Sequence, residues 1–156
     1  FAIDKAMQGR YKNIIKSLCI AQILITGIFF VNNHPHQQVY FNHFVSHKDE
    51  HLRKNYDLDY WGCAYKQGIE HILAVDNSDT IRLLHGIVPP NNPMIIPAAE
   101  RKRIKMVVGL EKPTYFITNF RMHPDDYPYT NIVYEIKVLN STIMRVYKLD
   151  TSDKLP

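Results

Sequence analysis

Apolar residues are concentrated in one part of the chain. In the segment Ser17–Val31 the polar groups are limited to a serine, a glutamine, a threonine and the thiol of Cys19. This run is shorter than the ~20 residues that cross the hydrocarbon core of a bilayer. Because the apolar pattern continues back to Tyr11, and Lys16 can extend its ammonium group to the headgroups, the run predicts a membrane-spanning or membrane-associated helix.

Two other interpretations of this apolar run stay open. The first is a buried core helix of a soluble domain, and the second is a signal sequence. No A-x-A-like cleavage site follows the run, which argues against the signal sequence. The chain also begins with Phe1, so we expect it to be part of a longer protein.

Basic residues flank the apolar run on one side only. Four precede it, namely Lys5, Arg10, Lys12 and Lys16, whereas the first base after it is Lys48. Positively charged flanks are retained in the cytoplasm. The N-terminal side is therefore predicted to be cytoplasmic, and the residues after about position 32 are predicted to be extracytoplasmic.

The stretch HPHQQVYFN, residues 34–42, follows the apolar run directly. Pro35 ends a helix, and the aromatic residues that follow carry apolar surface, so this stretch is predicted to connect the membrane to a folded domain. His34 is a candidate for binding a phosphate-bearing substrate. A helix exit with hydrogen-bonded side chains also explains this histidine.

The remaining chain contains helical and strand patterns. Residues 57–75, DLDYWGCAYKQGIEHILAV, predict a helix capped by Asp57 or Asp59. Its apolar stripe consists of Tyr60, Trp61, Ala64, Tyr65, Ile69, Ile72 and Leu73. A second helix is predicted to begin at Pro97 and to end at Gly109.

Strand patterns are present at residues 80–86, 113–120, 132–138 and 142–149. The last two are separated only by Leu139–Ser141, which predicts an antiparallel hairpin. Strands and helices that alternate before a closing hairpin predict an α/β domain with a mixed sheet. The expected organisation is a cytoplasmic flank and transmembrane helix over residues 1–33, followed by an extracytoplasmic α/β domain over residues 34–156.

Composition and charge limit the classes of protein. Of the 156 residues, 46% are hydrophobic and 22% are charged, which are ordinary values that suggest neither a disordered nor a fibrous chain. Two cysteines give no disulfide framework. The net charge of +4 and the run ERKRIK, Glu100–Lys105, indicate a solvated helix or, second, an anionic lipid or phosphate partner. No nucleic-acid-binding motif accompanies this charge, so nucleic acid is not expected as a partner.

Three histidines form the first group with candidate chemistry. His43, His47 and His51 are spaced by four residues, so a helix would place them on one face that is suited to zinc. The neighbouring sequence VYFNHFV favours a strand, however, and no HExxH or CxxC pattern is present. We therefore expect a hydrated histidine surface, with no metal and no other cofactor in this chain.

The segment RMHPDDYPY, residues 121–129, forms the second group. It follows a predicted strand, at the edge where ligand sites of open α/β sheets lie. Its Arg121 and His123 are candidates for substrate binding. Consecutive Asp125 and Asp126 are expected to mark a Pro-containing turn rather than to form an acid/base pair.

Residues at the start of the first predicted helix form the third group. Asp59, Tyr60 and Trp61 are candidates for a platform that stacks against a sugar ring, because flat aromatic faces suit carbohydrates. The alternative is that these residues pack as an ordinary helix N-terminus, with the aspartate as its cap.

Several of these segments also carry a family resemblance. The stretches are HPHQQVYFN, DLDYWGCAYKQGIEHIL, TYFITNFRMHPDDYPY and VYEIKVLNSTIMRVYKL, in this order. Together they resemble the C-terminal extracytoplasmic region of bacterial polytopic membrane glycosyltransferases, in the superfamily of dolichyl-phosphate-mannose protein mannosyltransferases and aminoarabinose transferases. The matching positions are His34, Pro35, Gln37, Val39, Tyr40, Phe41, Asn42, Asp59, Tyr60, Trp61 and Gly62, whereas His36 stands where tyrosine is usual. The resemblance extends from His34 to Leu149.

The resemblance implies an enzyme of the bacterial inner membrane that transfers a sugar from a polyprenyl-phosphate donor to an extracytoplasmic acceptor. It implies that the catalytic carboxylate lies in an earlier loop of the complete protein, and it leaves a divalent metal open as a cofactor of the parent enzyme. This chain is then a non-catalytic part that contacts membrane lipid and, through the complete protein, the donor and the acceptor. Two alternatives stay open: a membrane-anchored binding or scaffolding domain without catalysis, and a soluble domain that binds a metal through its histidines.

Overall fold

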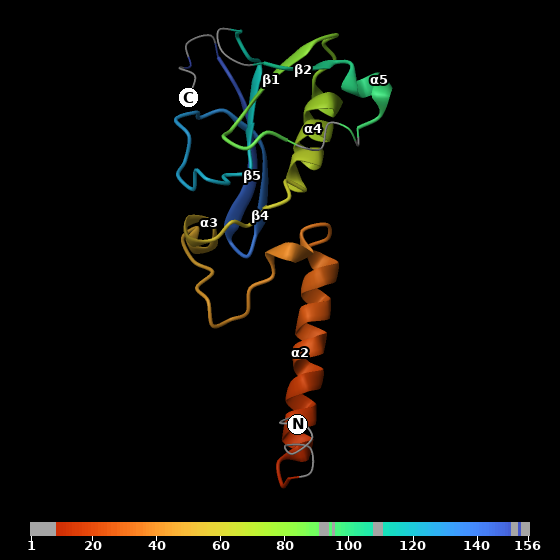
Figure 1. Cartoon of the computed structure of the whole chain (residues 1–156), viewed down its shortest axis with the longest axis vertical. Coiled ribbons are helices and arrows are strands. Elements are labelled where there is room, and N and C mark those ends of the chain that lie inside the picture. The colour runs from red at the N-terminus through yellow and green to blue at the C-terminus, as the bar shows by residue number, and fades with distance from the viewer. Residues whose placement is uncertain (1–8, 91–93, 95, 108–110, 151–152, 154–156) are drawn as a thin grey trace. The chain divides into compact units, whose positions relative to one another are not determined.

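The computed structural model describes residues 9–90, 94, 96–107, 111–150 and 153. The chain forms two compact units, residues 1–40 and residues 41–156, and most of their helices and strands are labelled in Figure 1. The sequence placed a domain boundary after residue 33. That boundary at a membrane stays a prediction; the compact units divide after Tyr40, because the side chain of this tyrosine packs against the helix of the first unit.

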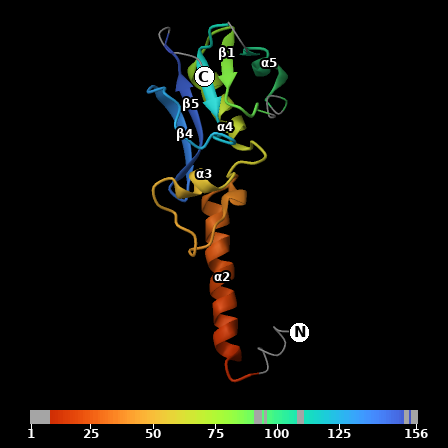
Figure 2. The same ribbon diagram turned by 60° about the vertical axis from the view of Figure 1, so that its left-hand side comes forward.

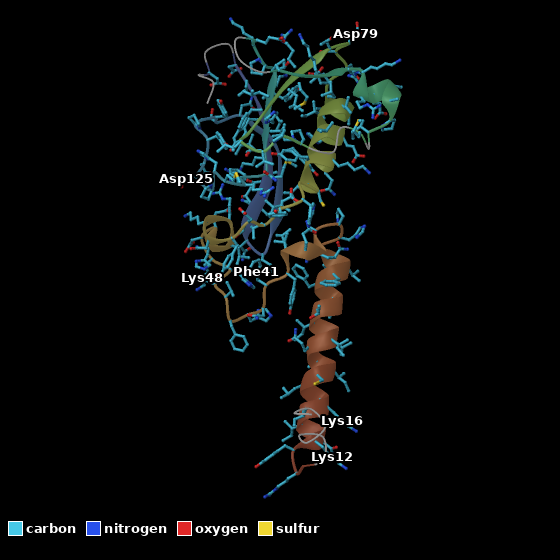
Figure 3. All side chains as sticks on the ribbon, in the orientation of Figure 1. Lys12, Lys16, Phe41, Lys48, Asp79 and Asp125 are labelled. Atoms are coloured by element: carbon cyan, nitrogen blue, oxygen red, sulfur yellow. The ribbon has the colours of Figure 1, made fainter. Side chains whose placement is uncertain are left out.

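Helix α2, Lys12–Asn32, dominates the first unit. At ~1.5 Å per residue, its 21 residues extend over about 30 Å, which is the thickness of a bilayer's hydrocarbon core. The helix is therefore long and apolar enough to cross a membrane. None of its residues is buried, so it does not have the environment of a core helix. Lys12 and Lys16 lie near its N-terminal end (Figure 3).

The residues after α2 fold back onto its C-terminal half. A short 3₁₀ helix, η1 (Gln37–Val39), precedes Tyr40, whose ring lies edge-on to Phe29 with the centroids 5.1 Å apart. The amide of Gln22 donates hydrogen bonds to the hydroxyl of Tyr40 at 2.8 Å and to the hydroxyl of Thr26 at 3.0 Å. Gln22 and Thr26 of this apolar helix thus have hydrogen-bond partners in each other and in Tyr40.

The second unit is built on a five-stranded sheet in the order β2-β1-β3-β5-β4 (Figures 1 and 2). Its strands are β1 Ile81–His85, β2 Ile104–Met106, β3 Tyr115–Thr118, β4 Ile132–Val138 and β5 Ser141–Lys148. Strand β1 is parallel to β2 and β3, whereas β5 is antiparallel to β3 and β4. The predicted fold class is confirmed: an N-terminal apolar helix precedes an α/β unit with a mixed sheet and a C-terminal hairpin.

The closing hairpin has a tight turn at Leu139 and Asn140. Both residues have positive φ angles, 50° and 58°. Two consecutive left-handed residues form the type of turn whose twist matches that of the flanking strands. The two strands that the sequence predicts on either side of this turn are β4 and β5, and they pair as expected.

Helix α4, Ala64–Val75, covers one face of the sheet (Figures 1 and 2). The predicted stripe residues within it are buried, namely Ala64, Tyr65, Ile69, Ile72 and Leu73. Gly68 allows a close approach to the sheet, since a Cβ atom there would lie 2.7 Å from Ile117 and 2.9 Å from Met144. Ile117 of β3 and Met144 of β5 therefore face α4, together with the other residues on the same face of these strands.

Aromatic rings cover the opposite face of the sheet. Phe116 of β3 lies between Tyr127 and Tyr129, with ring centroids 4.6 and 5.1 Å apart, and Tyr147 of β5 completes the group. All four rings are buried. The segment 119–131 therefore forms a second layer on the sheet in place of a helix.

Two of the predicted helices differ from those observed. The first begins at Ala64 rather than at residue 57, because Gly62 has a φ of 67° that a right-handed helix excludes. The second was predicted from Pro97 to Gly109, but helix α5 spans only Ala98–Arg101. Strand β2 follows, since Ile104–Met106 pairs in parallel with β1 instead of continuing the helix. Gly109 lies outside the described residues.

Candidate functional site

The D-Y-W-G sequence forms a tight turn before α4. The carboxylate of Asp59 is buried and accepts hydrogen bonds from the backbone N–H groups of Cys63 at 2.8 Å and Ala64 at 3.2 Å. These groups belong to the first turn of the helix and have no partner within it. Gly62 closes the turn with its left-handed backbone and donates to the carbonyl of Asp59 at 3.0 Å. The first and last residues of the motif are therefore structural.

The two central residues of this turn are exposed. The side chain of Trp61 is 72% exposed and that of Tyr60 is 50% exposed. Their rings meet edge to face, with centroids 5.1 Å apart. The guanidinium of Arg121 lies 3.9 Å above the Tyr60 ring and donates to the Tyr60 carbonyl at 3.1 Å. Tyr60 and Trp61 thus leave the predicted apolar stripe, and we call them the aromatic pair.

The segment after β3 fixes this turn in place. The side-chain amide of Asn119 donates to the carbonyl of Asp59 at 3.0 Å, although the two residues are 60 positions apart. The hydroxyl of Tyr65, in α4, donates to the carbonyl of Val88 at 2.8 Å and accepts from the Asn119 backbone. The carboxyl end of β3, which is the edge favoured by ligand sites, is therefore joined to the aromatic pair.

An open depression lies beside this turn. It has a volume of about 360 Å³ and is lined by Arg53, Lys54, Asn55, Tyr56, Asp57, Phe120, Met122 and Pro124. A narrow recess shares several of these residues and also includes Asn119 and Arg121. Arg121 therefore borders both the narrow recess and the aromatic pair. The volume is at the lower end of the range for small-molecule sites.

Buried charges stabilise the wall of the depression. Helix α3, His51–Asn55, carries Arg53, whose side chain is 4% exposed and donates to Asp126 at 2.9 Å. The same guanidinium lies 4.4 Å above the ring of Phe120 and 3.2 Å from the carboxylate of Glu50. Asp126 also pairs with Arg145 of β5. Arg53 is thus neutralised by carboxylates and held rigidly.

Asp126 is expected to stabilise the second unit through this network. The hydrogen bond from Arg53 holds the pKa of Asp126 below its ordinary value, although burial opposes this effect. A carboxyl group whose pKa is lower in the folded state stabilises the fold above its unfolded pKa, ~3.9, and loses this contribution as the pH falls through its folded pKa. The Asp126→Asn variant should lose about 1 kcal/mol of unfolding free energy near neutral pH, because the carboxylate is largely exposed.

Pulse proteolysis in urea measures this loss in the anchored chain. The difference between Asp126→Asn and the wild type should shrink when the measurement is repeated below about pH 4. Asp125→Asn is the matched control, since the Asp125 side chain is exposed and forms no ion pair among the described residues. Equal losses in both variants would show that the Arg53 contact contributes nothing specific.

The structure brings together four of the six residues predicted to bind substrate. Asp59, Tyr60, Trp61 and Arg121 meet at the turn, although Asp59 acts as a helix cap. His123 lies two residues beyond Arg121, but its ring stacks on Tyr127 with centroids 4.3 Å apart. His34 belongs to the first unit. The sequence did not single out Asn119, Tyr56, Asp57 or Phe120 as members of the site.

The three spaced histidines do not share a helical face. Helix α3 begins at His51, so His43 and His47 lie before it in a turn-rich segment. The rings of His43 and His47 are 5.9 Å apart, whereas His51 packs against Tyr56. Among the described residues no three histidine, cysteine or acidic side chains are grouped to hold a metal ion.

Comparison of the chain with models of protein families, with curated proteins and with solved structures gave no match. The function must therefore be inferred from the site and from the resemblance of its sequence segments.

Proposed function

We propose that this chain is the C-terminal part of a bacterial membrane glycosyltransferase, related to the protein mannosyltransferases and aminoarabinose transferases. The complete enzyme transfers a sugar from a polyprenyl-phosphate donor to an acceptor outside the cytoplasm. In this proposal α2 is the last transmembrane helix, and residues 41–156 form an extracytoplasmic cap. The cap contacts substrate and does not supply the catalytic base.

The observation that carries the proposal is the division of roles within the D-Y-W-G turn. Asp59 and Gly62 are buried and build the turn, whereas Tyr60 and Trp61 are exposed beside Arg121. Packing therefore accounts for the two outer residues of the motif but not for the two aromatic residues between them. Aromatic faces next to a hydrogen-bond donor suit a sugar, which presents both C–H groups and hydroxyls.

The acidic residues near the site support a non-catalytic role. A general base must reach the acceptor hydroxyl and have a pKa suited to taking its proton. The carboxylate of Asp59 is committed to two backbone N–H groups, and that of Asp126 is committed to two arginines that lower its pKa. We therefore place the catalytic carboxylate, and any divalent metal that the enzyme uses, in other parts of the complete protein.

A membrane-anchored binding domain without catalysis is the second candidate function. The exposed aromatic pair also favours it, because binding requires no base. The third alternative, a soluble metal-binding domain, is favoured by no observation: α2 has no buried residue, and the histidines do not share a helical face.

The proposed orientation places the N-terminal side of α2 in the cytoplasm of a bacterial inner membrane. We expect a membrane-impermeant maleimide to label a Thr130→Cys variant in spheroplasts, in a background that lacks Cys19 and Cys63. A Gly9→Cys variant should be labelled only after permeabilisation, because the basic residues next to it stay inside. The reverse pattern would overturn the proposed orientation.

Deletion of the reading frame that encodes this chain tests the proposed function. Mass spectrometry of cell-surface glycans, glycolipids and glycoproteins should show the loss of one sugar unit, and the corresponding polyprenyl-phosphate sugar should accumulate. Reintroduction of the complete frame should restore the sugar. Unchanged glycans and an unchanged pool of lipid-linked sugars would contradict the proposal and favour the non-catalytic binding domain.

A further inference from the structure

We propose that the depression beside Arg121, together with the aromatic pair, binds one pyranose ring of a glycan. That the site binds a sugar does not depend on the proposed function. That the bound glycan is a substrate does rest on it. The ring stacks on Trp61, and its hydroxyls bond to the polar side chains of Arg121, Asp57 and Lys54. All the residues that form this proposed site belong to the second unit.

The first observation is the exposure of the aromatic pair. Trp61 keeps 72% of its surface exposed, although tryptophan usually buries most of its surface. Tyr60 meets the indole at an interplanar angle of 80° and is itself held by the guanidinium of Arg121. The indole is therefore presented on a fixed support. A flat apolar face of this kind matches the C–H face of a pyranose.

The second observation is that a narrow recess lined by Arg121 adjoins the depression. Arg121, which contacts Tyr60, lines the narrow recess together with Tyr56 and Asp57. Tyr56 and Asp57 also line the larger depression of about 360 Å³. A ligand that stacks on the aromatic pair can therefore extend along Arg121 into a space that accommodates a sugar ring.

The charges of the lining favour hydroxyl groups over a phosphate. Arg53 is paired with Asp126 and Glu50, so its charge is already compensated. The exposed side chains of Lys54 and Asp57 bring one donor and one acceptor of opposite charge to the same wall. Mixed donors and acceptors bind hydroxyls, whereas a phosphate site gathers uncompensated cations or several backbone N–H groups.

The backbone of the wall is held in an uncommon conformation. Phe120 and Met122 have φ angles of 59° and 62°, in the left-handed region that large side chains rarely adopt. Such a residue costs about 1–3 kcal/mol, and this conformation is concentrated at ligand sites. Both residues line the depression. The conformation fixes Arg121, which lies between them, against Tyr60.

Trp61 is the single tryptophan of the chain, so its fluorescence reports on this site alone. The full chain in lipid nanodiscs is titrated with methyl glycosides of glucose, galactose, mannose, N-acetylglucosamine and glucuronic acid. We expect at least one glycoside to protect Trp61 saturably from quenching by acrylamide. Asp57→Asn and Tyr60→Ala should each weaken that binding about tenfold or more, which corresponds to ~1.4 kcal/mol.

Phe44→Ala is the matched control, since this side chain is 99% exposed and does not line the depression. It should leave the titration unchanged. The exposed position of Asp57 means that its substitution tests binding rather than folding, and near-ultraviolet circular dichroism checks that the fold is retained. The titration measures sugar binding by this chain itself, whereas the gene deletion measures the activity of the complete protein. A negative titration therefore contradicts the pyranose site, and unchanged glycans after deletion contradict the proposed function.

Three results would overturn the proposed pyranose site. The first is the absence of protection by all five glycosides. The second is quenching of Trp61 by brominated lipids in the nanodisc, which would assign the aromatic pair to the membrane surface. The third is protection by inorganic phosphate at concentrations where no glycoside protects, which would assign an anion site.

Discussion

Replacing Leu24 with arginine is expected to release most of the chain from membranes. Leu24 lies near the middle of α2 and is 60% exposed, so no described neighbour shields a charge placed there. Arginine at the centre of a transmembrane helix costs about 2.5–3.5 kcal/mol in insertion. This corresponds to a factor of roughly one hundred in the equilibrium between inserted and released chains. Extraction at alkaline pH, followed by quantification of the pellet, measures the loss.

Ser17→Arg is the control for this experiment. Ser17 lies in the same helix, one residue after Lys16, which is near the N-terminal end of α2 (Figure 3). A basic side chain at the end of a transmembrane helix can extend to the headgroups. The Ser17→Arg variant should remain in the membrane pellet like the wild type. If Leu24→Arg is retained as well, α2 does not cross the hydrocarbon core.

Truncation of Phe116 is expected to have the largest effect on the stability of the second unit. Its ring is fully buried in the aromatic face of the sheet, between Tyr127 and Tyr129. Phenylalanine-to-alanine substitutions at such positions cost about 3–5 kcal/mol, from lost burial and from the cavity that remains. Phe116→Ala should therefore unfold residues 41–156 at far lower urea concentrations in pulse proteolysis.

The same measurement on Phe44→Ala provides the control. Phe44 belongs to the same unit, but its side chain is 99% exposed, so its removal should change the unfolding free energy by less than about 0.5 kcal/mol. If Phe116→Ala is as stable as this control, the segment 119–131 does not form a packed second layer on the sheet.

The α/β class was predictable because several elements carry strong local patterns. The hairpin strands β4 and β5 alternate in polarity and flank Leu139–Asn140, and the buried positions of α4 repeat with helical spacing. Strand β2 was missed, because its three residues overlap the end of a basic run and give too little periodicity. Its pairing partner β1 lies more than twenty positions earlier, and only this tertiary contact selects a strand there.

The site was only partly predictable, for a related reason. The motif drew attention to Asp59, Tyr60 and Trp61 as a stacking platform, yet the helical pattern also placed both aromatic residues on the apolar stripe. The left-handed Gly62 interrupts that helix and turns the rings outward. The contacts that complete the site join residues far apart, such as Asn119 with Asp59 and Arg53 with Asp126, which are 60 and 73 positions apart. Local patterns contain no signal for contacts at that separation.

Sugar transfer from a labelled polyprenyl-phosphate donor tests the central claim most directly. Membranes from the deletion strain are prepared with the complete reading frame, with that frame ended before Phe41, or with the 156-residue chain alone. We predict labelled product only with the complete frame, because in the proposed function the catalytic carboxylate lies outside this chain and the cap contacts the substrate. Product formed by the chain alone, or undiminished product without residues 41–156, would contradict the claim.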